Sequence, residues 1–122
     1  MKVSVIIPCL DSAAYIGAAI GTLLRQTHAP VEIIVADNGS QDASRDIVRS
    51  FGDKVRLIEA PERGASRARL AGLAEATGEA LMFFDADDVI APETLAALVA
   101  ALEAGEGGIC LLYTSPSPRD RG

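Results

Sequence analysis

Three aspartates within four residues carry the strongest chemical signal in this 122-residue chain. Asp85, Asp87 and Asp88 directly follow the apolar segment 80–84. Carboxylates this close repel one another unless a cation neutralises them, and their oxygens suit hard divalent ions such as Mg²⁺ or Mn²⁺. Alternation along an extended segment would place Asp85 and Asp87 on the same side. The alternative is a solvated acidic turn that caps the next helix, but the position after a buried strand favours the metal site.

Two polar residues end a second apolar segment. Asp37 and Asn38 begin the tetrad Asp37-Asn38-Gly39-Ser40, which follows 32–36. Asn-Gly is a common turn, and a turn alone explains most such sequences. As a functional element, either side chain would hydrogen-bond the edge of a base or a ribose.

Three arginines, Arg63, Arg67 and Arg69, form the one tight basic cluster. Guanidinium geometry suits a diphosphate, whereas a solvated face with salt bridges is the commoner fate of surface arginines. The chain has 11 Lys+Arg against 17 Asp+Glu, a net charge of −6. That balance argues against nucleic acid as a partner and leaves room for a local phosphate site.

Apolar strand-like segments alternate with segments of helical periodicity. Such alternation indicates an α/β three-layer sandwich (α/β/α) around a mostly parallel sheet. Because ligands of such sheets bind beyond the carboxyl ends of the strands, the loops 8–11, 37–40 and 85–88 should converge in one cleft. The expected strands are 3–7, 32–36, 55–58 and 80–84. The first expected helix runs from an Asp11 or Ser12 N-cap to 26, and the second from an Asp42 or Ser44 N-cap to 50. The third covers 64–76, with Leu70, Leu73 and Ala74 as its apolar face, and the last runs from Pro92 to 102.

The last residues break this pattern. Residues 110–120, which include Pro116 and Pro118, resemble a translated sequencing adaptor. We therefore expect 1–109 to be the N-terminal part of a longer domain and 110–122 to be a non-native or disordered tail outside the core. The short apolar piece 109–113 would still be able to pair with an exposed sheet edge. No segment of the sequence resembles a targeting or membrane-spanning segment.

The motifs occur in an order that resembles the N-terminal half of a family 2 glycosyltransferase of the GT-A fold. The resemblance covers roughly 2–104 and rests on several short motifs together. Asn38, where the family usually has a second acidic residue, and Leu70, where Asn is common, depart from the pattern. The matching motifs are V-S-V-I-I-P at 3–8, Y-I at 15–16, L-R-Q-T at 24–27, I-I-V-A-D-N-G-S-Q-D at 33–42, G-A-S-R-A-R-L-A-G at 64–72 and F-D-A-D-D at 84–88.

The resemblance implies a nucleotide-diphospho-sugar site in a truncated GT-A fold. Pro8 and the residues after it, Cys9 first, would line the nucleoside pocket, although the sequence around Cys9 suggests only a small buried residue. Asp37 and Asn38 would lie at the base, and Arg69 at the base or diphosphate. Mg²⁺ or Mn²⁺ on the diphosphate would be held by Asp87, helped by Asp85 and Asp88, with Asp85 also near the substrate.

The resemblance also implies that sugar transfer requires a catalytic base and an acceptor site in addition to the donor site. The acceptor-side catalytic base is expected downstream of these residues, so no catalytic residue is assigned and this polypeptide alone is expected to be inactive. The acceptor, a saccharide or a lipid-linked group, is open. The resemblance is consistent with a cytoplasmic enzyme, including one peripheral to the inner face of the membrane. The alternative is a truncated nucleotide-binding fragment without activity of its own, whereas a dinucleotide-binding fold lacks its G-x-G-x-x-G after the first strand.

Overall fold

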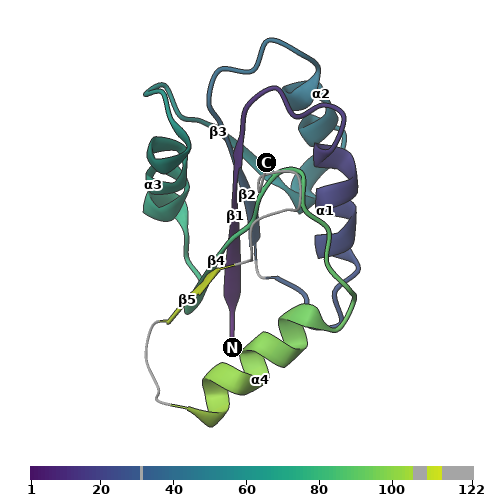
Figure 1. The fold of residues 1–122 in the computed structure, drawn as a ribbon, viewed down its shortest axis with the longest axis vertical. Helices are drawn as coiled ribbons and strands as arrows, with labels where there is room; N and C mark the ends of the chain where they lie inside the picture. The colour runs from purple at the N-terminus through teal and green to yellow at the C-terminus, as the bar shows by residue number, and fades with distance from the viewer. Residues whose placement is uncertain (31, 106–109, 114–122) are drawn as a thin grey trace, which may run out of the picture.

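The chain folds into an α/β domain built on a five-stranded sheet (Figure 1). The computed structural model describes residues 1–30, 32–105 and the backbone of 110–113. Each strand expected from the sequence is present, with small differences at the ends. The elements are β1 (Val3–Cys9), α1 (Ile16–Leu24), β2 (Glu32–Asp37), α2 (Ser44–Arg49), the short 3-10 helix η1 (Gly52–Lys54), β3 (Arg56–Glu59), α3 (Ala65–Glu75), β4 (Ala80–Phe83), α4 (Thr94–Ala104) and β5 (Cys110–Tyr113).

The sheet has the strand order β3-β2-β1-β4-β5, and every pairing is parallel. The central strand β1 pairs with β2 from Ser4↔Glu32 to Cys9↔Asp37 and with β4 from Val3↔Ala80 to Ile6↔Phe83. The chain leaves β1 toward β2 on one side and returns on the other side as β4. The loops after these strands therefore meet at one end of the sheet.

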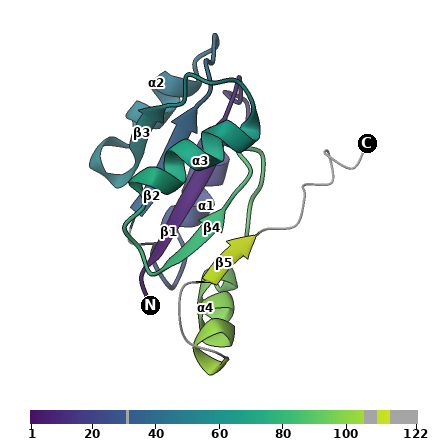
Figure 2. The same cartoon turned by 90° about the vertical axis from the view of Figure 1, so that its left-hand side faces the viewer.

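Helices cover both faces of the sheet, so the expected three-layer architecture is confirmed. Helix α3 lies on one face, and α1 and α2 lie on the opposite face (Figures 1 and 2). The main core joins alternate residues of β1, β2 and β4 to α1, α2 and α4. The smaller core joins Ala68 of α3 to Ala36 and Ala60. The period-two alternation of the strands thus divides the apolar residues between two cores.

Helix α3 packs through small residues, and the predicted apolar face was wrong. Ala68 and Gly72 are buried, whereas Leu70 is 56% exposed and Leu73 is 38% exposed. A Cβ added at Gly72 would lie 2.4 Å from Ile6 Cγ2 of β1. The helix therefore approaches the sheet too closely for a large side chain at the contact. The leucines point away because the close contact selects the opposite side of the helix.

The helix starts differ from those expected from the sequence. Helix α1 begins at Ile16 with Tyr15 as its N-cap and no side-chain cap, so neither the Asp11 nor the Ser12 side chain caps it. Helix α4 begins at Thr94, two residues after Pro92. Helix α2 begins at Ser44 with Ala43 as its N-cap and no side-chain cap, although Asp42 Oδ1 accepts the N–H of Ser44.

A buried amide, Gln26, ties α1 to α4. Its Oε1 accepts the N–H of Leu95 at 2.9 Å, and its Nε2 donates to Ala91 O at 2.8 Å. The first bond satisfies one of the N–H groups that a helix leaves without a partner in its first turn. Gln26 therefore has a structural role that its place in the L-R-Q-T segment did not indicate.

The expected tail contributes an edge strand. Residues Cys110–Tyr113 pair in parallel with β4, from Ala80↔Cys110 to Phe83↔Tyr113. The anticipated pairing with the sheet edge is thus present, although the segment was expected outside the core. Residues 106–109 and 114–122 lie outside the described part of the chain, and the domain boundary at 109 stays a prediction. Within the described residues, no helix has both the length and the apolar character that a membrane crossing requires.

Acid should weaken the amino-terminal end of the sheet through Glu32. Burial acts to raise the pKa of this carboxyl, but hydrogen bonds from Ser4 and Thr77 prevail and lower it below its ordinary value of 4.5. A lowered pKa in the folded state adds stability above the unfolded-state pKa, and this stability is lost as pH falls through the folded-state pKa. We expect Glu32→Gln to flatten the decline in stability below about pH 4.5, measured by urea unfolding at several pH values. An unchanged acid dependence would contradict this.

Candidate functional site

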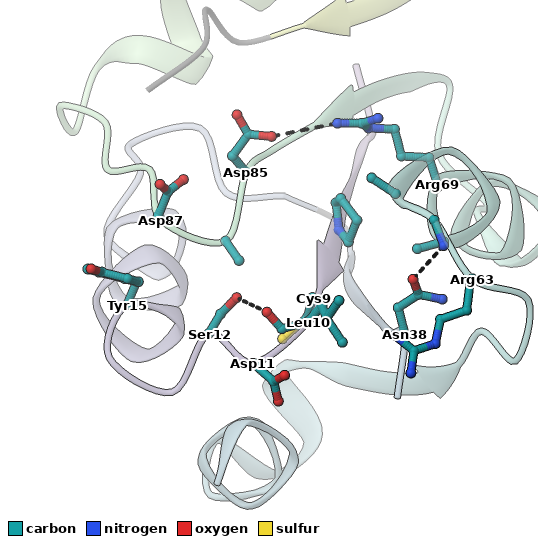
Figure 3. A pocket seen from close by; sticks show the side chains of 15 residues that line it. Cys9, Leu10, Asp11, Ser12, Tyr15, Asn38, Arg63, Arg69, Asp85 and Asp87 are labelled. Atoms are coloured by element: carbon teal, nitrogen blue, oxygen red, sulfur yellow. Dashed lines mark hydrogen bonds and ion pairs between the residues drawn. The ribbon is translucent and has the colours of Figure 1, made fainter. Parts of the chain in front are cut away.

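The main cavity lies beyond the carboxyl ends of β1 and β4 and beside the start of α3. Its volume is about 570 Å³. The loops after β1 and β4 and the first turns of α3 supply most of its wall (Figure 3). It is lined by Pro8, Cys9, Leu10, Asp11, Ser12, Tyr15, Asn38, Arg63, Gly64, Ala65, Ala68, Arg69, Asp85, Ala86 and Asp87.

Most of the residues singled out from the sequence meet in this cavity. Three do not: Asp37 lines a smaller neighbouring cavity of about 170 Å³, and Asp88 and Arg67 are absent from the lining of both. Those that line the main cavity are Pro8, Cys9, Asn38, Arg63, Arg69, Asp85 and Asp87. The convergence expected at the strand ends is therefore present.

An ion pair joins α3 to the loop after β4. Arg69 Nη2 lies 3.7 Å from Asp85 Oδ1 (Figure 3). The side chain of Arg69 is 26% exposed, yet its Nε is buried and has no hydrogen-bond partner among the described residues. A buried donor without an acceptor is unfavourable, whereas the exposed part of the guanidinium is at the cavity, where it can bind an anionic group.

The arginine cluster divides between the cavity and the surface. Arg63 and Arg69 line the cavity. Arg67, which lies between them in sequence, is 60% exposed and pairs with Glu62 at 3.2 Å. The surface-charge interpretation thus holds for Arg67, and the phosphate interpretation is compatible with the other two.

Asp37 uses its carboxylate within its own turn. The side chain is buried; Oδ2 accepts the N–H groups of Gly39 and Ser40, and Oδ1 accepts the Ser40 hydroxyl at 2.6 Å. Arg45 lies 3.8 Å away as a counter-ion. The hydroxyl oxygen of Ser40 in turn accepts the N–H of Asp11. Asp37 therefore supports the loop after β1 indirectly, and the predicted contact with a base stays a prediction.

The loop after β1 is held by side chains that the sequence indicated only as helix caps. Asp11 has a φ of 47°, a left-handed conformation that is uncommon outside glycine. Ser44 Oγ accepts the N–H of Ser12, and Asp42 Oδ2 accepts the N–H of Ala13. These bonds join the loops after β1 and β2. The Asp-x-Ser spacing of 42–44 was the available signal, but it was interpreted only as a helix cap.

Cys9 is buried at the floor of the cavity, as expected for a small core residue. Burial raises the pKa of its thiol; hydrogen bonding by Ser44 opposes the shift in part, and the charge of Asp37 adds to it. The thiol is therefore protonated at neutral pH and is a poor nucleophile.

The aspartates after β4 offer two carboxylates to the cavity. The backbone N–H of Asp88 donates to Asp85 O in a turn, and only Asp85 and Asp87 line the cavity. Among residues 1–30 and 32–105, no three His, Cys, Asp or Glu side chains are placed to hold one metal ion. The metal-binding role expected of Asp85, Asp87 and Asp88 stays a prediction. Mg²⁺ is commonly bound by one or two carboxylates plus substrate phosphates and water, and the pair that lines the cavity fits that pattern.

The sequence and the fold both match known glycosyltransferases. The model of the family "Glycosyl transferase family 2" matches residues 4–120. An uncharacterized glycosyltransferase of Nostoc sp. is 40% identical over 110 residues, covering 87% of this chain and 34% of the relative. The chain therefore belongs to glycosyltransferase family 2, and it spans about a third of that relative's length.

Two solved structures share the fold. TarS 1–349 of S. aureus in complex with UDP has a TM-score of 0.78 and 30% identity, covering 85% of this chain and 32% of that one. The mannosyltransferase PcManGT of Pyrobaculum calidifontis in complex with GDP-Man and Mn²⁺ has a TM-score of 0.74 and 31% identity, covering 80% and 31%. The GT-A type of architecture expected from the motifs is confirmed.

Proposed function

We propose that this chain forms the donor-binding part of a glycosyltransferase, which binds a nucleoside-diphosphate sugar together with Mg²⁺ or Mn²⁺. The observation that carries the proposal is that the Arg69 guanidinium and the carboxylates of Asp85 and Asp87 line the same cavity, with Arg69 Nη2 3.7 Å from Asp85 Oδ1. A guanidinium group suits the phosphate oxygens of a diphosphate, and carboxylates on the same cavity suit its metal ion. The complexes of relatives with UDP and with GDP-Man and Mn²⁺ support the same ligand class.

The diphosphate would lie between α3 and the loop after β4. Guanidinium groups bind phosphate oxygens in a fixed geometry, and Arg69 and Arg63 reach this space from one side. Asp87 and Asp85 face it from the other side as oxygen ligands for the cation. A bound cation would supply Lewis-acid stabilisation of the charge that develops on the leaving diphosphate.

The nucleoside would lie against the loop after β1. Leu10 and Tyr15 line the cavity and remain 44% and 42% exposed, so apolar surface is available there. Pro8 and Cys9 form the wall beside them. Binding cavities typically combine such apolar surface with a few polar groups that fix orientation. The hydrogen bonds that hold Asp11, Ser12 and Ala13 would keep this wall in place before the ligand binds.

Isothermal titration of the full chain with UDP, GDP and dTDP, with and without Mn²⁺, tests the proposal. Metal-dependent binding of at least one of the three is expected. Absence of binding to all three, with Mn²⁺ and with Mg²⁺, would contradict it. Transfer of a sugar to a saccharide or lipid-linked acceptor is a separate measurement, and donor binding without transfer would favour the alternative of a nucleotide-binding fragment.

Two arginines two residues apart provide a matched comparison. We expect Arg69→Lys to weaken UDP binding about tenfold, because a lysine cannot reproduce the planar set of donors. Arg67→Lys should change the affinity less than about twofold, since a surface ion pair with Glu62 contributes little. Calorimetric affinities of both variants check this. Equal effects at the two positions would indicate that only general surface charge matters.

A further inference from the structure

Asn38 joins the end of β2 to the segment that leads into α3. Its Nδ2 donates to Ala60 O at 2.9 Å and to Glu62 O at 2.7 Å. Its Oδ1 accepts the N–H of Gly64 at 2.8 Å (Figure 3). The side chain is buried, with 5% exposure. Three bonds therefore connect one carboxamide to three backbone groups of the segment 60–64.

The hydrogen-bonding pattern requires a carboxamide. Two backbone carbonyls need donors and one N–H needs an acceptor, and the amide of asparagine supplies both from a single short side chain. A carboxylate of the same shape would accept from Gly64 but would face the oxygens of Ala60 and Glu62 without a proton. An aspartate at this position would therefore disrupt two of the three bonds.

The segment that Asn38 holds carries part of the cavity wall. Residues 61–67 are exposed, so little packing fixes them. Arg63 and Gly64 line the cavity, and α3 begins at Ala65 and carries Arg69. Gly64 has a φ of 115°, a conformation that side-chain-bearing residues rarely adopt, so the bend into α3 is sharp. A shift of this bend would move Arg63 relative to Asp85 and Asp87.

We propose that Asn38 is a positioning residue of the nucleotide site. It holds the segment 60–64, and with it Arg63 and the start of α3, in the binding arrangement before a ligand is present. Because both of its amide N–H groups and one lone pair of its Oδ1 are bound to the segment 60–64, it acts through that segment. This inference rests on the proposed donor-binding function and adds to it the residue that preorganises one wall of the cavity.

Three variants of the full chain test this inference. Asn38→Asp keeps the shape and removes the two donors. Asn38→Ala removes the amide without adding a charge and replaces the first variant if that one does not fold. Val48→Ala, in the core between α2 and the sheet, lowers stability away from the cavity and serves as the control. For each variant, amide hydrogen exchange of 60–65 is measured without ligand, and the affinity for UDP is measured with Mn²⁺.

We expect Asn38→Asp to speed exchange in 60–65 and to weaken UDP binding about tenfold, with Val48→Ala changing neither. Unchanged exchange in 60–65, or a UDP affinity lowered no more than in Val48→Ala, would overturn the inference. Failure of the unaltered chain to bind UDP would instead contradict the proposed function, and the exchange measurement would still decide whether Asn38 holds the segment.

Discussion

Replacing Asp87 by asparagine is expected to abolish the metal-dependent part of UDP binding. Asp87 and Asp85 are the carboxylates after β4 that line the cavity, and Asp85 is already paired with Arg69. Removing one negative charge from a two-carboxylate site leaves too little charge to hold a divalent cation. A reduction in Mn²⁺ affinity of about a hundredfold or more is expected, since even residues that only support metal ligands contribute about 10–100-fold.

The measurement uses the metal itself. Mn²⁺ binding is followed by electron paramagnetic resonance, and UDP affinity is compared in Mn²⁺ and in EDTA. The unaltered chain should bind UDP more weakly in EDTA, whereas Asp87→Asn should bind it equally weakly in both. Asp46→Asn, an exposed carboxylate of α2 outside the cavity, is the charge-matched control and should behave as the unaltered chain. A variant at Asp87 that keeps its metal dependence would sink the assignment.

Gly72→Ala is expected to destabilise the domain by about 2 kcal/mol, because overpacking a core commonly costs about 1–3 kcal/mol. The new methyl group would lie 2.4 Å from Ile6 Cγ2 and 3.4 Å from Cγ1. Ile6 is fully buried in β1, and its branched side chain has little freedom to turn away. Alanine's better helix propensity, about 1 kcal/mol relative to glycine, offsets only part of the clash.

A second helical glycine provides the comparison. A Cβ at Gly17 in α1 would make an ordinary 3.6 Å contact with Ile47 Cγ2. Gly17→Ala should therefore be neutral or stabilise the fold by up to about 1 kcal/mol. Urea unfolding of both variants measures the difference. If the two alanine variants prove equally stable, α3 does not approach β1 as closely as described.

The main-chain architecture could be predicted from the sequence better than the roles of individual side chains. The alternation of β-branched segments with helical ones predicted the parallel sheet, since strands joined by helices on its faces run in one direction. That topology alone brings the ends of β1 and β4 together. It therefore predicted the convergence of Pro8, Asn38, Asp85 and Asp87 without any knowledge of side-chain packing, whereas Arg69 was expected at the site only from the family resemblance.

The face of α3 that packs on the sheet depends on how closely the helix backbone approaches β1. Hydrophobic periodicity in the sequence does not predict that distance. Leucines at 70 and 73 are the largest apolar residues of the helix, and hydropathy alone assigns them to the core. The observed contact is made by Ala68 and Gly72, because only small residues let the helix backbone come near Ile6. Shape complementarity, which involves residues far apart in the chain, decided between the two faces.

The sequence by itself determined which residue types lie at the carboxyl ends of the strands, because chain order and strand direction are local properties. Only the tertiary structure decided which polar groups remain available to a ligand. Asp37 and Asn38 are adjacent in one turn, yet one is occupied by Ser40 and Arg45 and the other by the segment 60–64. Arg69, by contrast, lines the cavity with a partly exposed side chain. The partners of Asn38 are backbone groups far away in the chain, and those contacts form only when the loops pack together.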